Sequence, residues 1–249
     1  MQLSESPDEI LAQIFSPELG WSHTDQGVLG YCPSYSDLRA LADLLRKKPG
    51  EEELQQFLEK CPQFLMGICG FGYDLPLAFL VKPSVGASPK ADFAVLSYGQ
   101  GGCRISLIEI KRSAADLYIQ SGKQAEKLRE AITQVEDRNL WLKSGVNIQT
   151  FVRDQLEYAK HLPQYPERAA NNSFRFKSSQ GIEEAWRSFG GYDHAIVEHI
   201  IVIGRWANLS EQDRKRLILQ NTNNGQLYSI FTYDQLARRG FDRPYFLPP

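Results

Sequence analysis

The most constraining feature of this chain is the segment at residues 92–111, DFAVLSYGQGGCRISLIEIK. It consists of two apolar runs with alternating character, joined by the glycine-rich sequence GQGG at residues 99–102. Apolar runs of this length that flank a short glycine-rich connection are typical of a β-hairpin. A hairpin also fixes which residues lie opposite one another, so the segment predicts a register as well as two strands.

With the turn centred between Gln100 and Gly101, antiparallel partners have residue numbers that sum to about 201, a value that follows from turn geometry. Asp92 then lies directly opposite Glu109. Side chains on a strand alternate between the two faces of a sheet, so Lys111 shares the face of Glu109. The interior of that face is apolar, because the same register pairs Ala94 with Leu107 and Leu96 with Ile105.

Two carboxylates at one end of an apolar face require a physical cause. Opposite residues have Cβ atoms about 4.5–5.5 Å apart, where like charges destabilise the sheet. A divalent cation between Asp92 and Glu109 reverses the sign of that interaction, and Mg²⁺ is usually held by one or two carboxylates and several waters. The Lys111 ammonium beside them can hold a water or stabilise charge on a phosphate. This arrangement predicts a metal-dependent site that cleaves phosphodiesters.

A simpler interpretation is that Lys111 pairs with Glu109 or Asp92 at a solvated sheet edge. Glu-x-Lys triplets are common on strands, so the three residues by themselves do not decide between the two interpretations. The rest of the chain supplies the context that does.

Periodic patterns predict further elements on both sides of the hairpin. Residues 34–48 form an amphipathic pattern that Ser36 or Asp37 could cap, and residues 51–65 form a second helix with three glutamates in its first turn. After the hairpin, helical patterns and apolar strands alternate. The expected helices are 121–143, 148–162, 210–222 with Ser210 as its cap, and 233–240 closed by Gly240; the expected strands are 77–82, 194–205 and 227–233. We therefore expect an α/β (α+β) fold with a mixed central β-sheet flanked by helices.

Composition narrows the functional classes. The 249 residues are enough for one main domain, and the net charge of −2 excludes a polycation that coats nucleic acid. The first 100 residues carry 7 basic and 13 acidic side chains, so the second part of the chain is the basic one. The four cysteines have no CxxC spacing, which argues against zinc. No apolar run approaches the roughly 20 residues of a membrane span, so we expect a cytoplasmic protein without membrane contact.

Several blocks together carry a family resemblance. The sequences EEELQQFLEKCPQFL, ADFAV, SLIEIKR, AITQVEDRNLWL and IVIGR, followed by IFTYDQLARRG, resemble the nuclease domain of Shedu-type bacterial antiphage defence proteins. That domain is a branch of the PD-(D/E)XK nuclease superfamily, which has a restriction-endonuclease-like core. The resemblance covers roughly residues 50–142 and 195–240. It implies an N-terminal helical extension at 1–49 and a nuclease domain at 50–249, with an insertion at about 145–194.

The resemblance also implies roles for single residues. Asp92 and Glu109 match the metal-binding acids of the superfamily motif, and Lys111 matches its catalytic lysine. Gln134 matches a glutamine that some branches place near the metal and the DNA backbone. An acidic residue of the first helix often completes the site, and here it is Glu53 or Glu52. The literal Pro-Asp of the motif is absent, since Pro89 lies three residues before Asp92.

The function implied is that of an Mg²⁺-dependent, or Mn²⁺-dependent, DNA endonuclease or nickase that acts as a homo-oligomer on invading DNA. Alternatives are a non-catalytic nucleic-acid-binding or protein-interaction module on a nuclease-like fold, and an enzyme acting on RNA or modified nucleotides. Trp141, Trp186 and Trp206 could stack on bases, although buried aromatic residues are commoner. The basic residues proposed to contact DNA are Arg112, Lys123, Lys127, Arg205, Arg214, Lys215 and Arg216.

Overall fold

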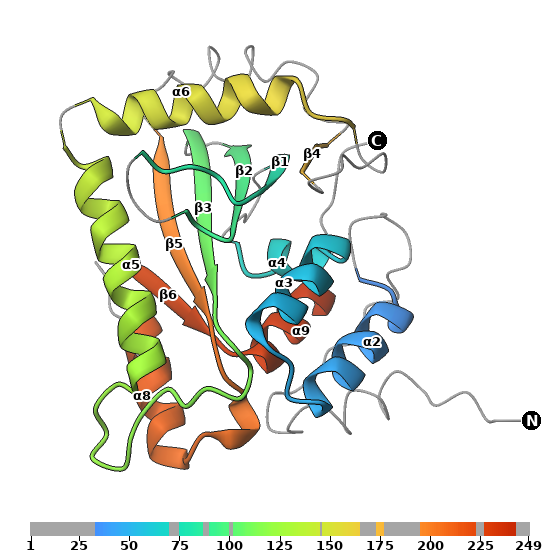
Figure 1. The fold of residues 1–249 in the computed structure, drawn as a ribbon, viewed down its shortest axis with the longest axis vertical. Helices are drawn as coiled ribbons and strands as arrows, with labels where there is room; N and C mark the ends of the chain where they lie inside the picture. The colour runs from blue at the N-terminus through green and yellow to red at the C-terminus, as the bar shows by residue number, and fades with distance from the viewer. Residues whose placement is uncertain are drawn as a thin grey trace, which may run out of the picture.

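A six-stranded mixed sheet forms the centre of the fold in the computed structural model (Figure 1). The structure describes residues 33–69, 75–86, 90–99, 102–144, 146–164, 173–176, 195–222 and 227–242. The strand order is β4-β1-β2-β3-β5-β6. The strands are β1 (Leu75–Val81), β2 (Phe93–Gly99), β3 (Gly102–Ile110), β4 (Phe174–Arg175), β5 (Ile196–Val202) and β6 (Tyr228–Phe231).

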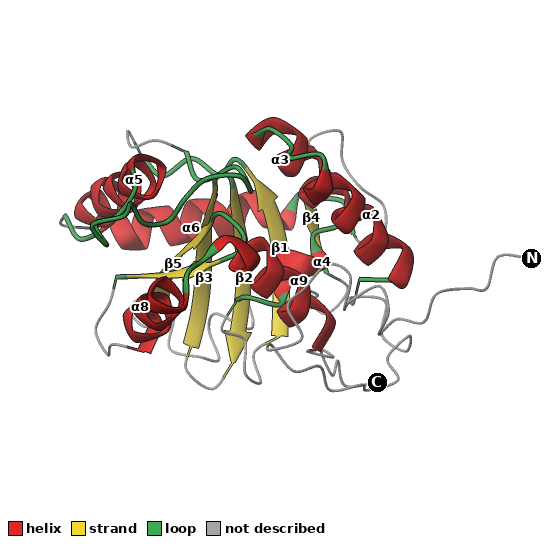
Figure 2. Cartoon of the chain, turned by 90° about the horizontal axis from the view of Figure 1, so that it is seen from below, coloured by secondary structure: helices red, strands yellow, loops and turns green. Residues whose placement is uncertain are grey.

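Helices cover both faces of the sheet, as the view from below shows (Figure 2). They are α2 (Tyr35–Arg46), α3 (Glu51–Lys60), α4 (Gln63–Met66), α5 (Glu126–Leu142), α6 (Asn147–Lys160), α8 (Glu211–Thr222) and α9 (Tyr233–Asp242), with a 3₁₀ turn at Trp206–Asn208. The expected α+β architecture with a mixed sheet is confirmed.

The hairpin forms in the predicted register. Strands β2 and β3 are antiparallel and pair Ala94 with Leu107 and Leu96 with Ile105. Strand β5 then pairs in parallel with β3, and β6 pairs in parallel with β5. Parallel strands buried on both faces are expected to be apolar throughout, which explains the run IIVI at residues 200–203.

Alternation along the strands divides the core into two sides. Ile108, Ile110 and Val202 face the helices α2, α3, α4 and α9. Leu107 and Ile105 face the opposite side, where the core includes residues of α6. Helices α5 and α8 complete that second side over β5 and β6. Glu109 and Lys111 belong to the second side by the same alternation, at the end of β3.

Two segments expected at the periphery contribute to the core. Helix α2, within the expected N-terminal extension, buries Leu38, Leu41 and Leu45, and its N-cap is Ser34 rather than Ser36 or Asp37. In the expected insertion, α6 buries an apolar stripe against the sheet, and β4 pairs with β1. Residues 1–32 and most of 165–194 lie outside the described residues. Among those that the structure describes, no helix is long and apolar enough to span a membrane.

Gly240 does not close the last helix, because α9 continues to Asp242. Gly240 instead lies where α9 crosses α4. A Cβ atom on Gly67 would be 2.3 Å from the backbone nitrogen of Gly240, and a Cβ on Gly240 would be 2.9 Å from the Cα of Phe64. The two backbones can approach this closely only because both positions lack a side chain.

We predict that Gly67→Ala destabilises the protein by about 2 kcal/mol or more, because the added methyl group forces α4 and α9 apart. Thermal unfolding should show a melting temperature lower by roughly 4–8 °C. Gly50→Ala is the matched control, since its Cβ would meet only Glu53 Oε2, at 3.8 Å. Equal melting temperatures for the two variants would contradict the close packing of α4 on α9.

Candidate active site

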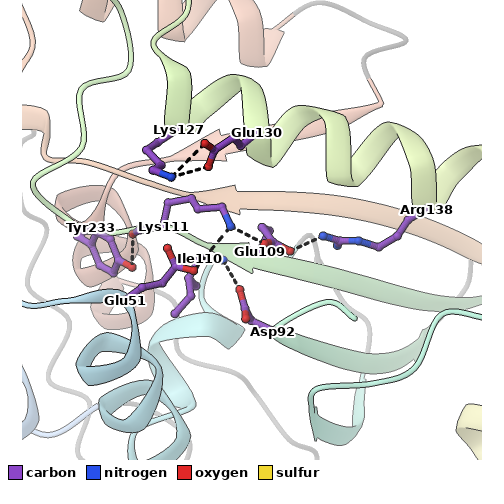
Figure 3. A network of polar contacts seen from close by, with 9 residues as sticks. All are labelled: Glu51, Asp92, Glu109, Ile110, Lys111, Lys127, Glu130, Arg138 and Tyr233. Carbon is purple, nitrogen blue, oxygen red and sulfur yellow. Dashed lines mark hydrogen bonds and ion pairs between the residues drawn. The ribbon is translucent and has the colours of Figure 1, made fainter. Parts of the chain in front are cut away.

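Asp92, Glu109 and Lys111 meet at the end of the hairpin, where β3 passes into the loop that leads to α5 (Figure 3). The backbone N–H of Ile110 donates to Asp92 Oδ2 at 2.8 Å, which fixes the Asp92 carboxylate across the two strands. The Lys111 ammonium donates to Glu109 Oε1 at 2.7 Å. The structure therefore brings together the three residues that the sequence singled out.

The cluster is largely buried. Glu109 is 4% exposed and Lys111 is 6% exposed, whereas Asp92 is half-buried. The second oxygen of Glu109 forms an ion pair with Arg138 of α5, a residue with no exposed surface. A buried carboxylate requires counter-charges, and Glu109 has one on each oxygen. Lys111 and Glu109 therefore do not form the solvated pair of the simpler interpretation.

The first turn of α3 also reaches the cluster, but through a different glutamate than expected. Glu51 lies 3.7 Å from the Lys111 ammonium and is 46% exposed. Glu53 instead accepts a hydrogen bond from the backbone N–H of Gly50 at 2.9 Å and caps its own helix. Glu52 is exposed and makes no contact with the cluster. Of the three glutamates in this turn, the one beside Lys111 is Glu51, which was not among the two expected candidates.

Burial is the main reason why the pKa of Asp92 rises from 3.8 to about 7, and the negative charge of Glu109 adds to the effect. The hydrogen bond from Ile110 and the charge of Lys111 oppose the shift without cancelling it. The two carboxylates therefore repel each other, as the sequence argument anticipated. A cation placed between them would remove the repulsion.

The lysine behaves differently. Burial acts to lower the pKa of Lys111, but the nearby carboxylates, Glu109 foremost, outweigh burial and raise this pKa above 10.5. The side chain is therefore a cation at neutral pH. It can donate hydrogen bonds to a water or a phosphate oxygen, but it has no free electron pair with which to accept a proton.

The C-terminal helix holds the backbone of this site. Tyr233, at the start of α9, is fully buried and donates its hydroxyl hydrogen to the carbonyl oxygen of Lys111 at 2.8 Å. Its neighbour Asp234 accepts hydrogen bonds from Arg205 Nε at 2.9 Å and Nη2 at 3.0 Å, and from the backbone of Trp206. These contacts tie the segment after β5 to α9 and give the sequences IVIGR and TYDQL a structural role.

Helix α5 presents one stripe of side chains toward the cluster. Glu130, Gln134 and Arg138 are spaced four residues apart, so they share a face. Glu130 interacts electrostatically with Lys111 and Arg112, and Arg138 contacts Glu109. Gln134 lies between them, and its buried Oε1 has no hydrogen-bond partner among the described residues. This position fits the role expected of Gln134.

The basic residues expected to contact DNA differ in whether they already interact with other side chains of the protein. Arg112 and Lys123 are exposed in the loop after Lys111 and form no ion pair with described residues. Lys127 pairs with Glu130 at 2.7 Å, and Arg205 is held by Asp234. The remaining members are engaged with neighbours: Arg214 lies over the Trp206 ring, Lys215 pairs with Glu211, and Arg216 pairs with Asp213.

The tryptophans are packing residues where the structure describes them. Trp206 is 6% exposed, and a Cβ on Gly86 would lie 2.1 Å from the half-buried Trp141 ring. Trp186 lies outside the described residues. Stacking of bases on Trp141 or Trp206 would therefore require these side chains to leave their packed positions.

The donor set suits a hard cation with few protein ligands. Within the described ranges, no group of three or more His, Cys, Asp or Glu residues could hold a metal ion. Asp92 and Glu109 alone would supply carboxylate oxygens, and Asp92 Oδ1 accepts no hydrogen bond from the residues described here. Mg²⁺ typically binds one or two carboxylates and keeps several waters. Asp92 Oδ1 fits that requirement as it stands, and Glu109 Oε1 fits it once the Lys111 ammonium moves away from that oxygen.

Several site residues carry no distinctive local pattern in the sequence. Arg138 occupies a buried position on a helix whose other buried residues are mostly apolar, and such an arginine needs a carboxylate partner. Lys82 adopts a left-handed backbone conformation with φ 49°, and its N–H donates to the carbonyl of Asp92 at 2.9 Å. Non-glycine residues adopt this conformation at a cost of about 1–3 kcal/mol, and they cluster near functional sites.

The raised pKa of Asp92 predicts a specific pH dependence of stability. Between pH 3.8 and about 7 the folded protein keeps a proton that the unfolded chain releases. This contribution is fully present below pH 3.8 and is lost as the pH rises through 7. Without divalent ions, Asp92→Asn should therefore melt about 5 °C above wild type at pH 8, for a gain of ~2 kcal/mol. At pH 5 the difference should be clearly smaller, because only the interval from pH 3.8 to 5 then contributes to the loss.

Asp116→Asn is the matched control, because Asp116 is exposed in the loop after Lys111. Its melting temperature should follow that of wild type at both pH values. A melting temperature of Asp92→Asn equal to or below that of wild type at pH 8 would show that Asp92 is not electrostatically strained.

Comparison with known proteins places this chain in a family. A search of curated proteins found no match. A family model described as "Shedu protein SduA, C-terminal" matches residues 48–237, which include the hairpin, α5, β5 and the first half of α9. This match spans well over half of the 249 residues. The chain therefore belongs to the Shedu protein SduA C-terminal family.

Proposed function

We propose that this protein is a metal-dependent DNA endonuclease or nickase that hydrolyses phosphodiester bonds of invading DNA. Membership of the Shedu family suggests antiphage defence as the biological role. The observation that carries the enzymatic proposal is the geometry of Asp92 and Glu109, two largely buried carboxylates at the same end of adjacent strands, with the Lys111 ammonium 2.7 Å from Glu109. A strained carboxylate pair is what a divalent cation would stabilise.

Each residue of the cluster would have a separate role in phosphodiester hydrolysis. Asp92 and Glu109 would hold Mg²⁺ or Mn²⁺, which when bound would supply a Lewis acid for a phosphoryl oxygen and lower the pKa of a bound water. Lys111 would orient the attacking water or stabilise the charge that develops on the phosphate. Gln134 would contact the water or the DNA backbone, and Tyr233 would hold the Lys111 backbone in place.

The charge of the site suits a phosphodiester. Its ionisable side chains are the acids Asp92, Glu109 and Glu51 and the cations Lys111 and Arg138. With all five ionised, the cluster carries one net negative charge, which a divalent cation converts to one net positive charge. A phosphodiester carries one negative charge, so it would neutralise the loaded site. Arg112 and Lys123 add exposed positive charge in the loop that follows Lys111, where flanking phosphates could bind.

A non-catalytic binding module is the second functional class. A module without chemistry would gain nothing from a half-buried aspartate whose pKa is raised to about 7, because that group destabilises the fold at neutral pH. Replacement of such a residue would be favourable unless its charge has a use. The cost of keeping Asp92 at this position therefore favours the enzyme over the module.

We predict that Lys111→Ala abolishes cleavage while the protein stays folded, because the lysine lies at a strand end. Purified wild type and variant would be incubated with supercoiled, linear and single-stranded DNA, in Mg²⁺ or in EDTA, and resolved on a gel. Wild type should cut in Mg²⁺ alone, with a rate at least 10²-fold above that of the variant. Lys47→Ala, at the exposed lysine that follows α2 as its C-cap, should cut like wild type.

The substrate that is cut identifies the mode of action. Conversion of supercoiled DNA to open circles alone indicates a nickase, whereas linear products indicate an endonuclease that cuts both strands. Normal cleavage by Lys111→Ala, or by Asp92→Ala with metal supplied, would contradict the assignment. Metal-independent binding of DNA without any cleavage would favour the binding module.

A further inference from the structure

Arg138 is a fully buried charge, in the part of the chain that the structure describes, that the proposed chemistry does not use. It has no exposed surface, and the only acid with which it forms an ion pair in the described part of the chain is Glu109. Its Nε and Nη1 atoms are buried and have no hydrogen-bond partner among described residues. Burying an ionised guanidinium is costly unless it is paired. Pairing with Glu109 is therefore the reason for an arginine at this position.

We infer that Arg138 is a positioning residue for Glu109: it fixes one oxygen of this carboxylate inside the core, so that the other oxygen stays at the cation site when Lys111 turns to the substrate. This inference rests on the proposed function, because the cation and the substrate belong to it. Arg138 itself touches neither of them in this account, and it acts only through Glu109.

The difference between the two cationic partners of Glu109 supports this division. Lys111 donates to Glu109 Oε1 at 2.7 Å and also lies 3.7 Å from Glu51, so its ammonium is shared between two carboxylates. Its long, flexible side chain can exchange partners with little distortion. Arg138 contacts Glu109 Oε2 from the opposite side and has no second acid among the described residues. Arg138 is thus the permanent counter-charge and Lys111 the movable one.

The surroundings of Arg138 leave its position little freedom. It projects from α5, whose residues Leu128, Val135 and Leu142 are buried against the sheet and neighbouring helices. His199 of β5 lies beside it, and burial, followed by the charges of Arg138 and Lys143, lowers the pKa of His199 to about 4. The imidazole is therefore neutral and adds no competing charge at neutral pH. A rigid cation in neutral surroundings can hold a carboxylate in one orientation.

This role makes a prediction that differs from simple core packing. Groups that orient metal ligands typically affect metal affinity or activity by about 10–100-fold when they are removed. Arg138→Met keeps most of the side-chain volume but removes the charge, so it should weaken the binding of Mn²⁺ by roughly 10–100-fold. It should lower kcat by a similar factor, with a change in the KM for DNA of less than about threefold.

Two further variants, Arg138→Lys and Arg129→Met, test whether Mn²⁺ binding depends on the planar guanidinium, on the positive charge alone, or on the place of that charge on α5. Arg138→Lys keeps the charge but loses the planar fork, so it should recover only part of the Mn²⁺ affinity. Arg129→Met is the matched control, because Arg129 is exposed on the same helix. Mn²⁺ binding is measured as the rise in melting temperature of each full-length protein across a Mn²⁺ titration, which requires no cleavage.

A double-mutant cycle in EDTA tests the contact itself without metal or DNA. Arg138→Met and Glu109→Gln should each lower the melting temperature, because each leaves the other charge buried without its partner. The double variant should lose clearly less than the sum of the two single losses, since it leaves neither charge. Arg129→Met combined with Glu109→Gln should show additive losses.

The outcomes distinguish the two claims. Non-additivity in the cycle, together with weakened Mn²⁺ binding by Arg138→Met, supports the positioning role. Additive losses, or Mn²⁺ binding and kcat equal to those of wild type in Arg138→Met, would overturn it. If wild type neither binds Mn²⁺ nor cleaves DNA, the proposed function fails. The role of Arg138 at a cation site fails with it, even where the cycle shows that Arg138 pairs with Glu109.

Discussion

The opposition of Asp92 and Glu109 across β2 and β3 is the constraint on which the rest of the site depends. The hairpin register brings the two acids to the same end of adjacent strands, and burial prevents water from screening their repulsion. Neither acid can move far, since Asp92 is held by the backbone of Ile110 and Glu109 by Lys111 and Arg138. The fold therefore holds Asp92 and Glu109 in mutual repulsion at the end of the hairpin.

Helices on both faces of the sheet contact the cluster of Asp92, Glu109 and Lys111. From one side, α5 supplies Arg138 as a buried counter-charge and Gln134, whose amide oxygen has no hydrogen-bond partner among the described residues. From the other side, α3 brings Glu51 to Lys111, and α9 clamps the Lys111 carbonyl through Tyr233. The close approach of α4 and α9 at Gly67 and Gly240 sets the position of α9. Distant segments of the chain thus converge on two strands of one hairpin.

The sequence was sufficient for the parts of the site that depend on local rules. Turn position and strand alternation predict that Asp92 faces Glu109 and that Lys111 shares its face, because both follow from a period of two. Arg138 and Glu51 were not predicted, because their contacts depend on how helices rotate and dock on the sheet. Gly240 resembled a helix stop in the sequence, but close packing against α4 was its actual use. Likewise, α6 joined the core although its surroundings in the sequence resembled an insertion.

The central claim is that Asp92 and Glu109 together bind a divalent cation. Its most direct test is anomalous diffraction from crystals of the full chain soaked in Mn²⁺, compared with crystals of Asp92→Asn treated in the same way. One strong anomalous peak in contact with both carboxylates is expected in the wild-type crystals, and it should be absent in the variant. A peak elsewhere, or no peak at this site in crystals that bind Mn²⁺ at other positions, would contradict it.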